Sequence, residues 1–309
     1  KEHQKTHQMS DNKVMKLPPE IVYEILSYQF RDLMSSDHPA NAERFQSNLR
    51  TFLKSNLEVN KTFRHVVTVL CYRYCNFTTA RGFYKLLETL KTSDKGYSKL
   101  IQIADFQELT SIGLGRTGEM NKMIKNLTNE TIWEFIRLTR SNLREFLASE
   151  HIQMDLDDMI IHALLSPTTG SVLSVVDFCG CSGSKFTQMF IQAVEKLYNG
   201  NEIIDYNYQI TCLGLNDCTD LPSYILGKLL NTLPELQKLD LRHTSLDDQT
   251  LIRGIPHLKG LTHLSLGMCS QLTPRTVLEF FSYHPAVTDE NNSTTLQWLN
   301  IQVHPHSSS

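Results

Sequence analysis

The chain has 309 residues, of which 40% are hydrophobic and 20% are charged, and these proportions are ordinary for a globular protein. Its 30 Lys and Arg residues stand against 33 Asp and Glu, and the resulting net charge of −3 gives no reason to expect a nucleic-acid or membrane surface. No apolar run approaches the roughly 18 residues that a membrane-spanning helix needs. The seven cysteines are an odd number, which favours reduced thiols and a cytoplasmic or nuclear protein over a disulfide framework.

The N-terminal part of the sequence predicts a small helical domain. The polar residues 1–14 are expected to be flexible, and residues 15–92 are expected to form the domain. Pro18 and Pro19 suit the first turn of a helix, where their missing N–H groups cost no hydrogen bond. Apolar residues then recur at helical spacing, and two further amphipathic helices are predicted within residues 48–74.

A glycine-rich segment follows this helical part. Gly113, Gly115 and Gly118 match G-x-G-x-x-G, a pattern that binds a pyrophosphate only between the strand and the helix of a βαβ unit. The flanking segment "ELTSI" could be the strand and "EMNKMIKNL" the helix, so the local context does not exclude such a site. The chain then continues into a capped amphipathic helix instead of a parallel-sheet alternation, so a connecting loop is favoured over a dinucleotide site.

The C-terminal two thirds of the sequence, residues 93–303, contain a recurring pattern, L-x-x-L-x-L-x-x-(C/N/T). A helix-like apolar periodicity follows each copy, so each unit reads as strand, turn, helix and return. The intervals from Ile210 to Leu236 and from Leu236 to Leu261 match the roughly 20–29 residues of leucine-rich repeats, and the longer intervals imply insertions. The copies begin at Leu143, Leu173, Ile210, Leu236, Leu261 and Leu296, and a further weak copy contains Ile101 and Ile103.

These repeats resemble those of leucine-rich-repeat proteins of the cysteine-containing subtype. The resemblance implies an α/β solenoid with parallel strands on the concave face and helices on the convex face, with residues 304–309 as a C-terminal tail. Cys181, Cys218 and Cys269 occupy the same repeat position and should form a ladder along the interior. The spacing of adjacent strands would allow disulfides, but packing as small apolar thiols is favoured.

The N-terminal helices carry a second resemblance. The segments "LPPEIVYEILSYQF" and "LKSNLEVNKTFRHVV" are similar to an F-box over about residues 15–75. Two departures are visible: residues 31–50 stand where most F-boxes have a short connection, and Phe63 replaces the commoner Trp. The matching positions are Leu17, Pro18, Glu20, Ile21, Leu57, Val59, Lys61, Phe63 and Arg64. Together with the repeats, they make the chain look like an F-box/leucine-rich-repeat protein of the budding-yeast type.

This family resemblance implies a function. F-boxes dock on Skp1, and a Cullin–RING scaffold then carries the ligase machinery, so the chain would be the substrate-recognition subunit of an SCF ubiquitin ligase. It would promote ubiquitination and proteasomal degradation of a protein bound by the repeats, with no catalytic residue, metal or cofactor of its own. Val59 and Phe63 are expected in the core of the helical domain. The expected Skp1-binding residues are Leu17, Pro18, Pro19, Ile21, Ile25 and Leu26.

The expected substrate site is the concave face of the solenoid, where alternate residues of each strand point away from the core. Trp and Arg beside other charged residues are typical of a recognition surface. Trp298 is a large aromatic residue at a position predicted to face solvent. It could be covered by a partner, covered by the C-terminal tail, or packed in the core. The expected substrate-binding residues are Lys238, Asp240, Arg242, His263, Trp298, Asn300 and Gln302. Smaller groups at Val175, Asp177, Cys179, Cys212, Gly214 and Asn216 are expected to form a shallow groove.

The residues themselves do not select a target. One yeast protein of the family recognises a citrate synthase, which makes a metabolic enzyme of that kind one candidate substrate. A leucine-rich-repeat scaffold or regulatory adaptor outside the ligase system is the alternative function, and Skp1 binding separates the two. A nucleotide-dependent enzyme that uses the glycine-rich segment is a remote third hypothesis.

Overall fold

The chain separates into two compact units, residues 1–71 and residues 72–309. The computed structural model describes residues 17–34, 42–109, 127–166, 170–199, 209–255, 258–287 and 295–301. The glycine-rich segment with Gly113, Gly115 and Gly118 lies outside these residues, as does Gln302.

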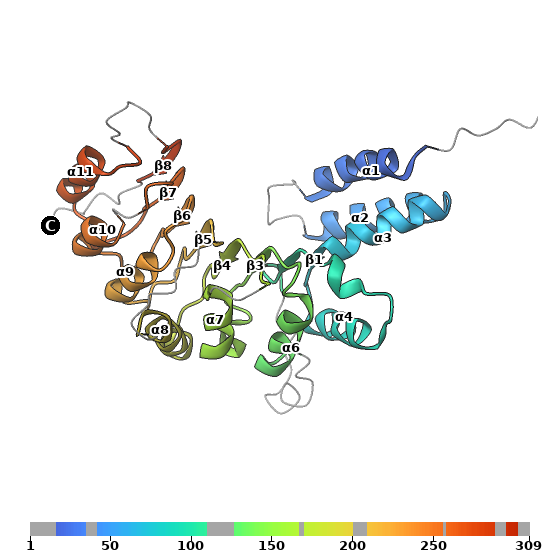
Figure 1. The fold of residues 1–309 in the computed structure, drawn as a ribbon, viewed down its shortest axis with the longest axis horizontal. Helices are drawn as coiled ribbons and strands as arrows, with labels where there is room; N and C mark the ends of the chain where they lie inside the picture. Colours follow the sequence, from blue (N-terminus) through green and yellow to red (C-terminus); the bar gives the residue numbers. More distant parts are fainter. Residues whose placement is uncertain are drawn as a thin grey trace, which may run out of the picture. The chain divides into compact units, whose positions relative to one another are not determined.

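The first unit contains the helices α1 (Pro19–Met34), α2 (Ala42–Leu57) and α3 (Lys61–Arg73) (Figure 1). Pro19 is the first residue of α1, where a missing N–H is tolerated. The helix packs on α2 through Phe30 and Phe52, whose ring centroids are 5.7 Å apart. The segment expected as an insertion, residues 31–50, therefore contributes the first half of a helix that packs on α1.

In the residues that the structure describes, the second unit is built on one sheet of eight parallel strands in sequence order. Each strand has three residues and pairs with the next in the same register, so equivalent residues of successive repeats lie side by side. The strands are β1 (Tyr74–Asn76), β2 (Ile103–Asp105), β3 (Glu145–Leu147), β4 (Val175–Asp177), β5 (Cys212–Gly214), β6 (Lys238–Asp240), β7 (His263–Ser265) and β8 (Trp298–Asn300).

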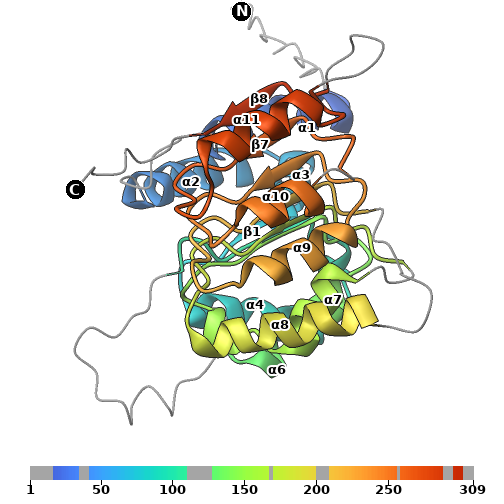
Figure 2. The same cartoon turned by 90° about the vertical axis from the view of Figure 1, so that its left-hand side faces the viewer.

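Helices connect the strands and form a layer on one side of the sheet, and the sheet lines the inner side of the curved second unit (Figure 1). In Figure 2, α8, α9, α10 and α11 follow one another along the stack, as expected for repeats that each add one helix. The helical segments are α4 (Ala80–Thr92), η2 (Tyr97–Leu100), α6 (Asn129–Thr139), η3 (Gln153–Asp155), α7 (Asp158–Leu165), α8 (Ser184–Asn199), α9 (Ser223–Asn231), α10 (Asp248–Gly254) and α11 (Pro274–Tyr283).

Side-chain caps fix where most of these helices begin. The hydroxyl or carboxylate of the residue before the helix accepts a hydrogen bond from a backbone N–H of the first turn, which would otherwise lack a partner. The capping residues are Thr79 for α4, Thr128 for α6, Asp157 for α7, Asp247 for α10 and Thr273 for α11.

The core lies between the sheet and the helices. The middle residue of each strand points into it, from Cys75 in β1 to Leu264 in β7, whereas Leu299 of β8 is half-buried. The first repeats fill this space with aromatic rings, such as Phe77 and Phe106 at 4.7 Å between centroids, and the later repeats fill it with leucines. The predicted α/β fold with a parallel sheet and a separate helical unit is confirmed in this architecture.

The boundary between the units differs from the expected one after residue 92. β1 and α4 fall within residues 15–92, yet both belong to the second unit, where β1 pairs with β2. The reason is local: α3 ends at Arg73, and a strand of only three residues is too short to show an alternation in the sequence.

Candidate functional site

Helix α1 presents a row of apolar side chains to solvent. Leu17, which precedes the helix, Ile21, Ile25 and Tyr28 recur at intervals of three or four residues, which places them on one face. They are between 43% and 62% exposed. These four residues are called the α1 row below. A row of large apolar groups on one helix face is typical of helices that bind a hydrophobic groove.

The structure divides the six expected Skp1-binding residues into two groups. Leu17, Pro18, Pro19, Ile21 and Ile25 are exposed. Leu26, in contrast, is only 1% exposed and packs inside the first unit, so its assignment to the partner surface needs correction.

A helix turns by about 100° per residue, which explains the different positions of Ile25 and Leu26. Leu26 shares the opposite face of α1 with Val22 and Phe30, both of which are also buried. Val59 corrects a second expectation, because it was expected in the core and is 53% exposed. Phe63, expected there too, is partly buried.

The concave side of the sheet contains a hollow of about 470 Å³ that extends over β4 to β8. It is called the concave hollow below. Strand residues on either side of the buried middle positions line most of it, as the alternation of side chains along a strand requires. Its lining consists of Val175, Asp177, Cys212, Leu213, Gly214, Asn216, Lys238, Leu239, Asp240, His263, Ser265 and Trp298.

Gly214 and Asp177 shape the floor of the concave hollow. The two residues are register partners on β5 and β4, and the Asp177 carboxylate extends over the glycine. Its Oδ1 accepts a hydrogen bond from the Cys179 backbone N–H at 2.8 Å, and its Oδ2 accepts one from Gln107 Nε2 at 3.1 Å. Burial raises the pKa of Asp177 above its usual range, and the charge of Asp240 acts in the same direction.

Asp240 and Arg242 form an ion pair at the rim. Arg242 Nη2 donates to Asp240 Oδ2 at 2.7 Å, and Arg242 Nε lies 3.0 Å from each carboxylate oxygen. This hydrogen bonding raises the pKa of the Arg242 guanidinium. Arg242 does not line the concave hollow, and its guanidinium is paired with Asp240.

Trp298 and His263 form the aromatic end of the concave hollow. They are register partners on β8 and β7, and their rings are stacked with centroids 6.2 Å apart. Trp298 is 48% exposed, so the alternative of core packing is wrong for this residue. The structure therefore brings together four of the expected substrate-binding residues: Lys238, Asp240, His263 and Trp298.

Asn300, a further expected substrate-binding residue, pairs with Ser265 in the strand register and is partly buried outside the lining of the hollow. The role of Gly214 was missed by sequence reasoning, which counted it only as a small group in a shallow groove. A glycine inside a strand is itself a signal, because it often marks the close approach of another group. Here that group is the Asp177 carboxylate.

The cysteines of the described residues are free thiols, as expected. Cys181, Cys218 and Cys269 are buried at equivalent turns after β4, β5 and β7, and Thr244 takes that position after β6. Cys218 Sγ donates to the Phe178 carbonyl at 3.1 Å, and Cys269 Sγ donates to the Leu241 carbonyl at 3.0 Å. In the predicted ladder, Cys218 and Cys269 therefore bind the backbone of the preceding repeat, whereas Thr244 donates to the Leu241 carbonyl of its own repeat.

The thiol at the floor of the concave hollow, Cys212, is not activated. Burial raises its pKa to about 11, and the charge of Asp177 acts in the same direction, so the nucleophilic thiolate is disfavoured at neutral pH. Across the part of the chain that the structure describes, no three His, Cys, Asp or Glu side chains are grouped so that they could hold a metal ion. None of the described helices is long and apolar enough to cross a membrane.

The fold and these surfaces define a leucine-rich-repeat type of solenoid that follows a separate helical unit with an exposed apolar row. The chain is 65% identical over 300 residues to the F-box protein YLR352W of Saccharomyces cerevisiae (strain ATCC 204508 / S288c). The match covers 95% of this chain and 37% of that protein, so the chain spans little more than a third of the length of this relative. This similarity confirms the resemblance to yeast F-box proteins.

Two other comparisons add less. No family model matches the chain. Among solved structures, the crystal structure of the Rad7 and Elc1 complex in yeast is similar with a TM-score of 0.41 and 16% sequence identity. The match covers 92% of this chain and 68% of that chain, and the likeness is too low to carry an argument about function.

Proposed function

We propose that the chain is the recognition part of an SCF ubiquitin ligase, a non-catalytic adaptor that binds Skp1 through its first unit. The α1 row is the observation that carries this proposal, and the similarity to a protein named as an F-box protein supports it. The expected surface keeps Leu17, Pro18, Pro19, Ile21 and Ile25, gains Tyr28 and loses Leu26.

The energetic reason concerns the water around the α1 row. Burying one fully exposed Ile or Leu side chain is worth about 1.5–3 kcal/mol, and a partner that covers Leu17, Ile21 and Ile25, which are 43–46% exposed, gains roughly half of that for each residue. The opposite face of α1 already fills the core of the first unit through Val22, Leu26 and Phe30. The row is therefore not needed for packing within this unit.

The concave hollow is the proposed site for the target protein. It combines the exposed ring of Trp298 with Lys238 and the carboxylates of Asp177 and Asp240. Aromatic and charged groups gathered in a concavity are typical of the residues that dominate a protein interface. A bound target would then be presented to the ligase for ubiquitination and subsequent degradation.

The proposal is tested by measuring binding of the purified chain to purified Skp1 by calorimetry. The variants Leu17→Ala/Pro18→Ala and Ile21→Asp/Ile25→Asp should each weaken binding by at least about tenfold, which corresponds to 1.4 kcal/mol. A matched control is Leu278→Asp/Tyr283→Asp, which changes two exposed apolar residues of α11 and should leave binding unchanged.

Two results would count against the proposal. Unchanged Skp1 binding in both α1 variants, with an unchanged melting temperature, would show that the α1 row is not the interface. An absence of Skp1 binding by the wild-type chain would favour a scaffold outside the ligase system. Targets are identified in a separate experiment, by mass spectrometry of proteins that the wild type retains and Trp298→Ala does not. This experiment also tests the citrate synthase candidate directly.

A further inference from the structure

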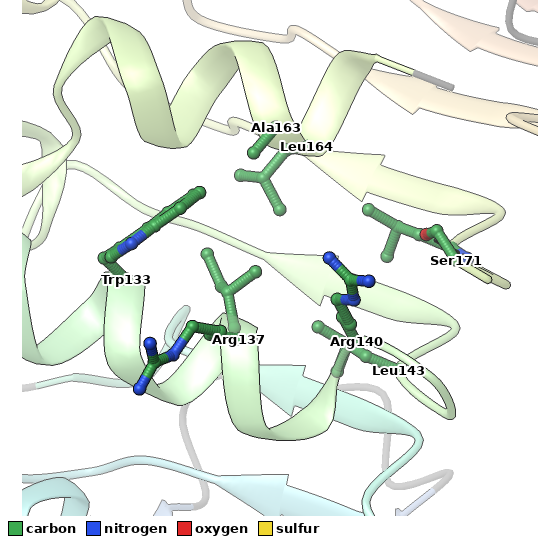
Figure 3. Close-up of a pocket in the computed structure, with 9 residues that line it drawn as sticks. Trp133, Arg137, Arg140, Leu143, Ala163, Leu164 and Ser171 are labelled. Atoms are coloured by element: carbon green, nitrogen blue, oxygen red, sulfur yellow. Dashed lines mark hydrogen bonds between the residues drawn. The ribbon is translucent and has the colours of Figure 1, made fainter. Parts of the chain in front are cut away.

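A second pocket lies in the helical layer of the second unit, on the opposite side of the sheet from the concave hollow. It is formed where α6 and α7 end and where the chain returns toward β3 and β4 (Figure 3). It is called the α6–α7 pocket below. Its lining consists of Trp133, Ile136, Arg137, Arg140, Leu143, Ala163, Leu164, Ser171 and Leu173.

The inner surface of the α6–α7 pocket is apolar. Ile136, Leu143, Leu164 and Leu173 belong to the buried core and form its base, whereas Trp133 is 37% exposed and forms one wall. The helices come closer further along the stack, where a Cβ added to Gly254 of α10 would lie 3.2 Å from Gly227 Cα of α9. The helical layer therefore opens at α6 and α7 and is tightly packed at α9 and α10.

The size of the α6–α7 pocket limits what it can hold. Its volume is about 150 Å³, which is close to that of an engineered protein cavity, also about 150 Å³, that binds benzene. Sites for drug-sized or cofactor-sized molecules typically measure about 300–1,000 Å³. The pocket thus suits one large side chain, such as that of Phe or Leu, better than a whole small-molecule ligand.

Two arginines border the pocket. Figure 3 shows the Arg140 side chain on the side of Leu143 and Ser171, whereas Arg137 lies on the side of Trp133. Both arginines are exposed, and among the described residues neither forms an ion pair or a side-chain hydrogen bond. Their place at the C-terminal end of α6 is favourable, because the helix dipole carries its partial negative charge there.

Three described carboxylates of α6 and α7 are engaged with other residues. Glu134 of α6 lies 3.3 Å from Lys91 of α4, and Asp158 of α7 pairs with Lys196 of α8. Asp157 caps α7 and accepts a hydrogen bond from Asn129. The charge beside the apolar base of the pocket is therefore positive, and a ligand with negative groups on both sides of an apolar group would complement it.

We propose that the α6–α7 pocket is a second protein-docking site that takes one apolar side chain of an acidic peptide segment. The anchor, a Phe or Leu, enters between Trp133 and Leu164, and Asp or Glu residues beside it pair with Arg137 and Arg140. A carboxylate can bind an arginine through two parallel hydrogen bonds, which fixes the orientation of the segment. The site lies on the helical layer and does not depend on Skp1 binding by the first unit.

The sequence provides a direct probe for this site. Trp133 and Trp298 are the two tryptophans of the chain, so Trp298→Phe leaves Trp133 as the sole indole reporter in the pocket wall. The probe is a synthetic peptide, acetyl-Glu-Glu-Phe-Glu-Glu-amide, added to the full chain. Saturable binding should shift Trp133 emission to shorter wavelength, because the phenyl ring displaces water from the indole.

Three variants in this background test the parts of the site. Arg137→Glu/Arg140→Glu should weaken binding by at least about tenfold, and so should Ala163→Phe, which fills the pocket without a change of charge. Arg253→Glu/Arg275→Glu is the matched control, because it makes the same charge change at exposed arginines of α10 and α11. It should alter binding by less than about threefold, and melting curves confirm that each variant is folded.

Several outcomes would overturn the proposal. Equal binding of a peptide with Gln in place of Glu would remove the role of the arginines, and equal binding with Ala in place of Phe would remove the role of the pocket. A response to benzoate alone at the same concentration would assign the pocket to a small carboxylate ligand. An absent response in folded protein would show that no such segment binds, and emission already at short wavelength would show that another part of the chain occupies the site.

Discussion

Gly214 of β5 lies directly beside Asp177 of β4, so close that a Cβ placed on the glycine would come within 2.6 Å of the Asp177 carboxyl carbon. Real Cβ atoms do not approach other atoms so closely, and the Asp177 side chain could turn away only by losing a hydrogen bond. The Cys179 backbone N–H and Gln107 Nε2 hold its two carboxylate oxygens. The missing side chain at residue 214 is therefore what allows a half-buried carboxylate to form part of the floor of the concave hollow.

The substitution Gly214→Ala should lower the free energy of unfolding by about 1–3 kcal/mol, the usual cost of inserting a methyl group into a tightly packed place. Asp177 would have to rotate and give up at least one of its two hydrogen bonds. The measurement is urea denaturation followed by circular dichroism. Because the cost arises from the contact with Asp177, it should shrink when the same substitution is made in an Asp177→Ala background.

Gly260→Ala is the matched control for this prediction. A Cβ at residue 260 would lie 3.8 Å from the Leu236 carbonyl oxygen, an ordinary van der Waals distance. It should therefore change the unfolding free energy by less than about 0.5 kcal/mol. Equal effects of the two alanines, or an undiminished effect of Gly214→Ala without Asp177, would show that the close approach is not what matters.

Truncation of two adjacent residues of α1 should affect two different properties, stability for Leu26 and Skp1 binding for Ile25. Leu26→Ala should lower the unfolding free energy by about 2–5 kcal/mol, because it leaves a cavity in the core of the first unit. Ile25→Ala should change stability by less than about 1 kcal/mol, because the side chain is 43% exposed and does not fill the core, and should weaken Skp1 binding instead. Chemical denaturation and calorimetry with Skp1 measure the two effects separately.

A result in which Ile25→Ala destabilises the protein as strongly as Leu26→Ala would contradict this division of α1 into two faces. Val22→Ala serves as a second buried control on the same helix, because Val22 is as buried as Leu26. It should reduce stability by less than Leu26→Ala, since fewer methyl groups are removed, and it should not act on Skp1 binding beyond the loss of folded protein.

Trp298 should contribute to target binding far more than to stability. If the concave hollow is the target site, Trp298→Ala should weaken binding of captured targets by about 2 kcal/mol or more, roughly thirtyfold, as central aromatic residues of interfaces do. The variant should retain the melting temperature within a few degrees, because the ring contacts His263 on one side and is otherwise half in water. Quantitative mass spectrometry of co-purified proteins measures the loss.

Tyr283→Ala is the control for Trp298, because Tyr283 is an exposed aromatic residue on the helical layer at α11. It should leave the set of captured proteins unchanged. Capture that survives in Trp298→Ala at wild-type levels would show that targets bind elsewhere, with the α6–α7 pocket as the next surface to test.

The sequence predicts the later repeats of the solenoid better than the earlier ones, and the reason is physical. In β5, β6 and β7 the inward position is leucine, and the thiol or hydroxyl that follows the strand binds the neighbouring backbone, so both leave a pattern at fixed spacing. In β1 and β2 the inward residues are Cys75 and Ala104, because phenylalanines from the neighbouring turns and helices fill the core there. The start of the sheet at Tyr74 therefore has no leucine signature.

The functional surfaces show a similar limit. Alternation along a strand was sufficient to place Lys238, Asp240, His263 and Trp298 on the concave face, because the direction of side chains is fixed by the backbone. The hydrogen bond from Gln107 to Asp177 and the α6–α7 pocket depend on residues far apart in the sequence. Spacing along the chain carries no record of such contacts.

His284 should make the last repeat sensitive to acid. It is buried after α11, with Nε2 3.0 Å from the Ile255 carbonyl oxygen and Nδ1 3.1 Å from the Ala286 N–H, which donates to it. This arrangement requires a neutral ring that carries its proton on Nε2. Burial lowers the pKa of His284, although the hydrogen bond to Ile255 acts in the opposite direction.

The sign of the effect on stability follows from this lowered pKa. Below the pKa of an exposed histidine, about 6.5, the unfolded chain takes up a proton that the folded chain does not, so the unfolding free energy falls as the pH falls. Above about pH 7 both states are neutral at this residue and its contribution is constant. His284→Gln removes the titrating group, so the difference in unfolding free energy between wild type and variant should be steady from pH 7 to 8 and should shrink from pH 6.5 to 5. Denaturant titrations at each pH measure this difference, and parallel profiles for the two proteins would show that His284 takes up its proton as readily in the folded state as in the unfolded state.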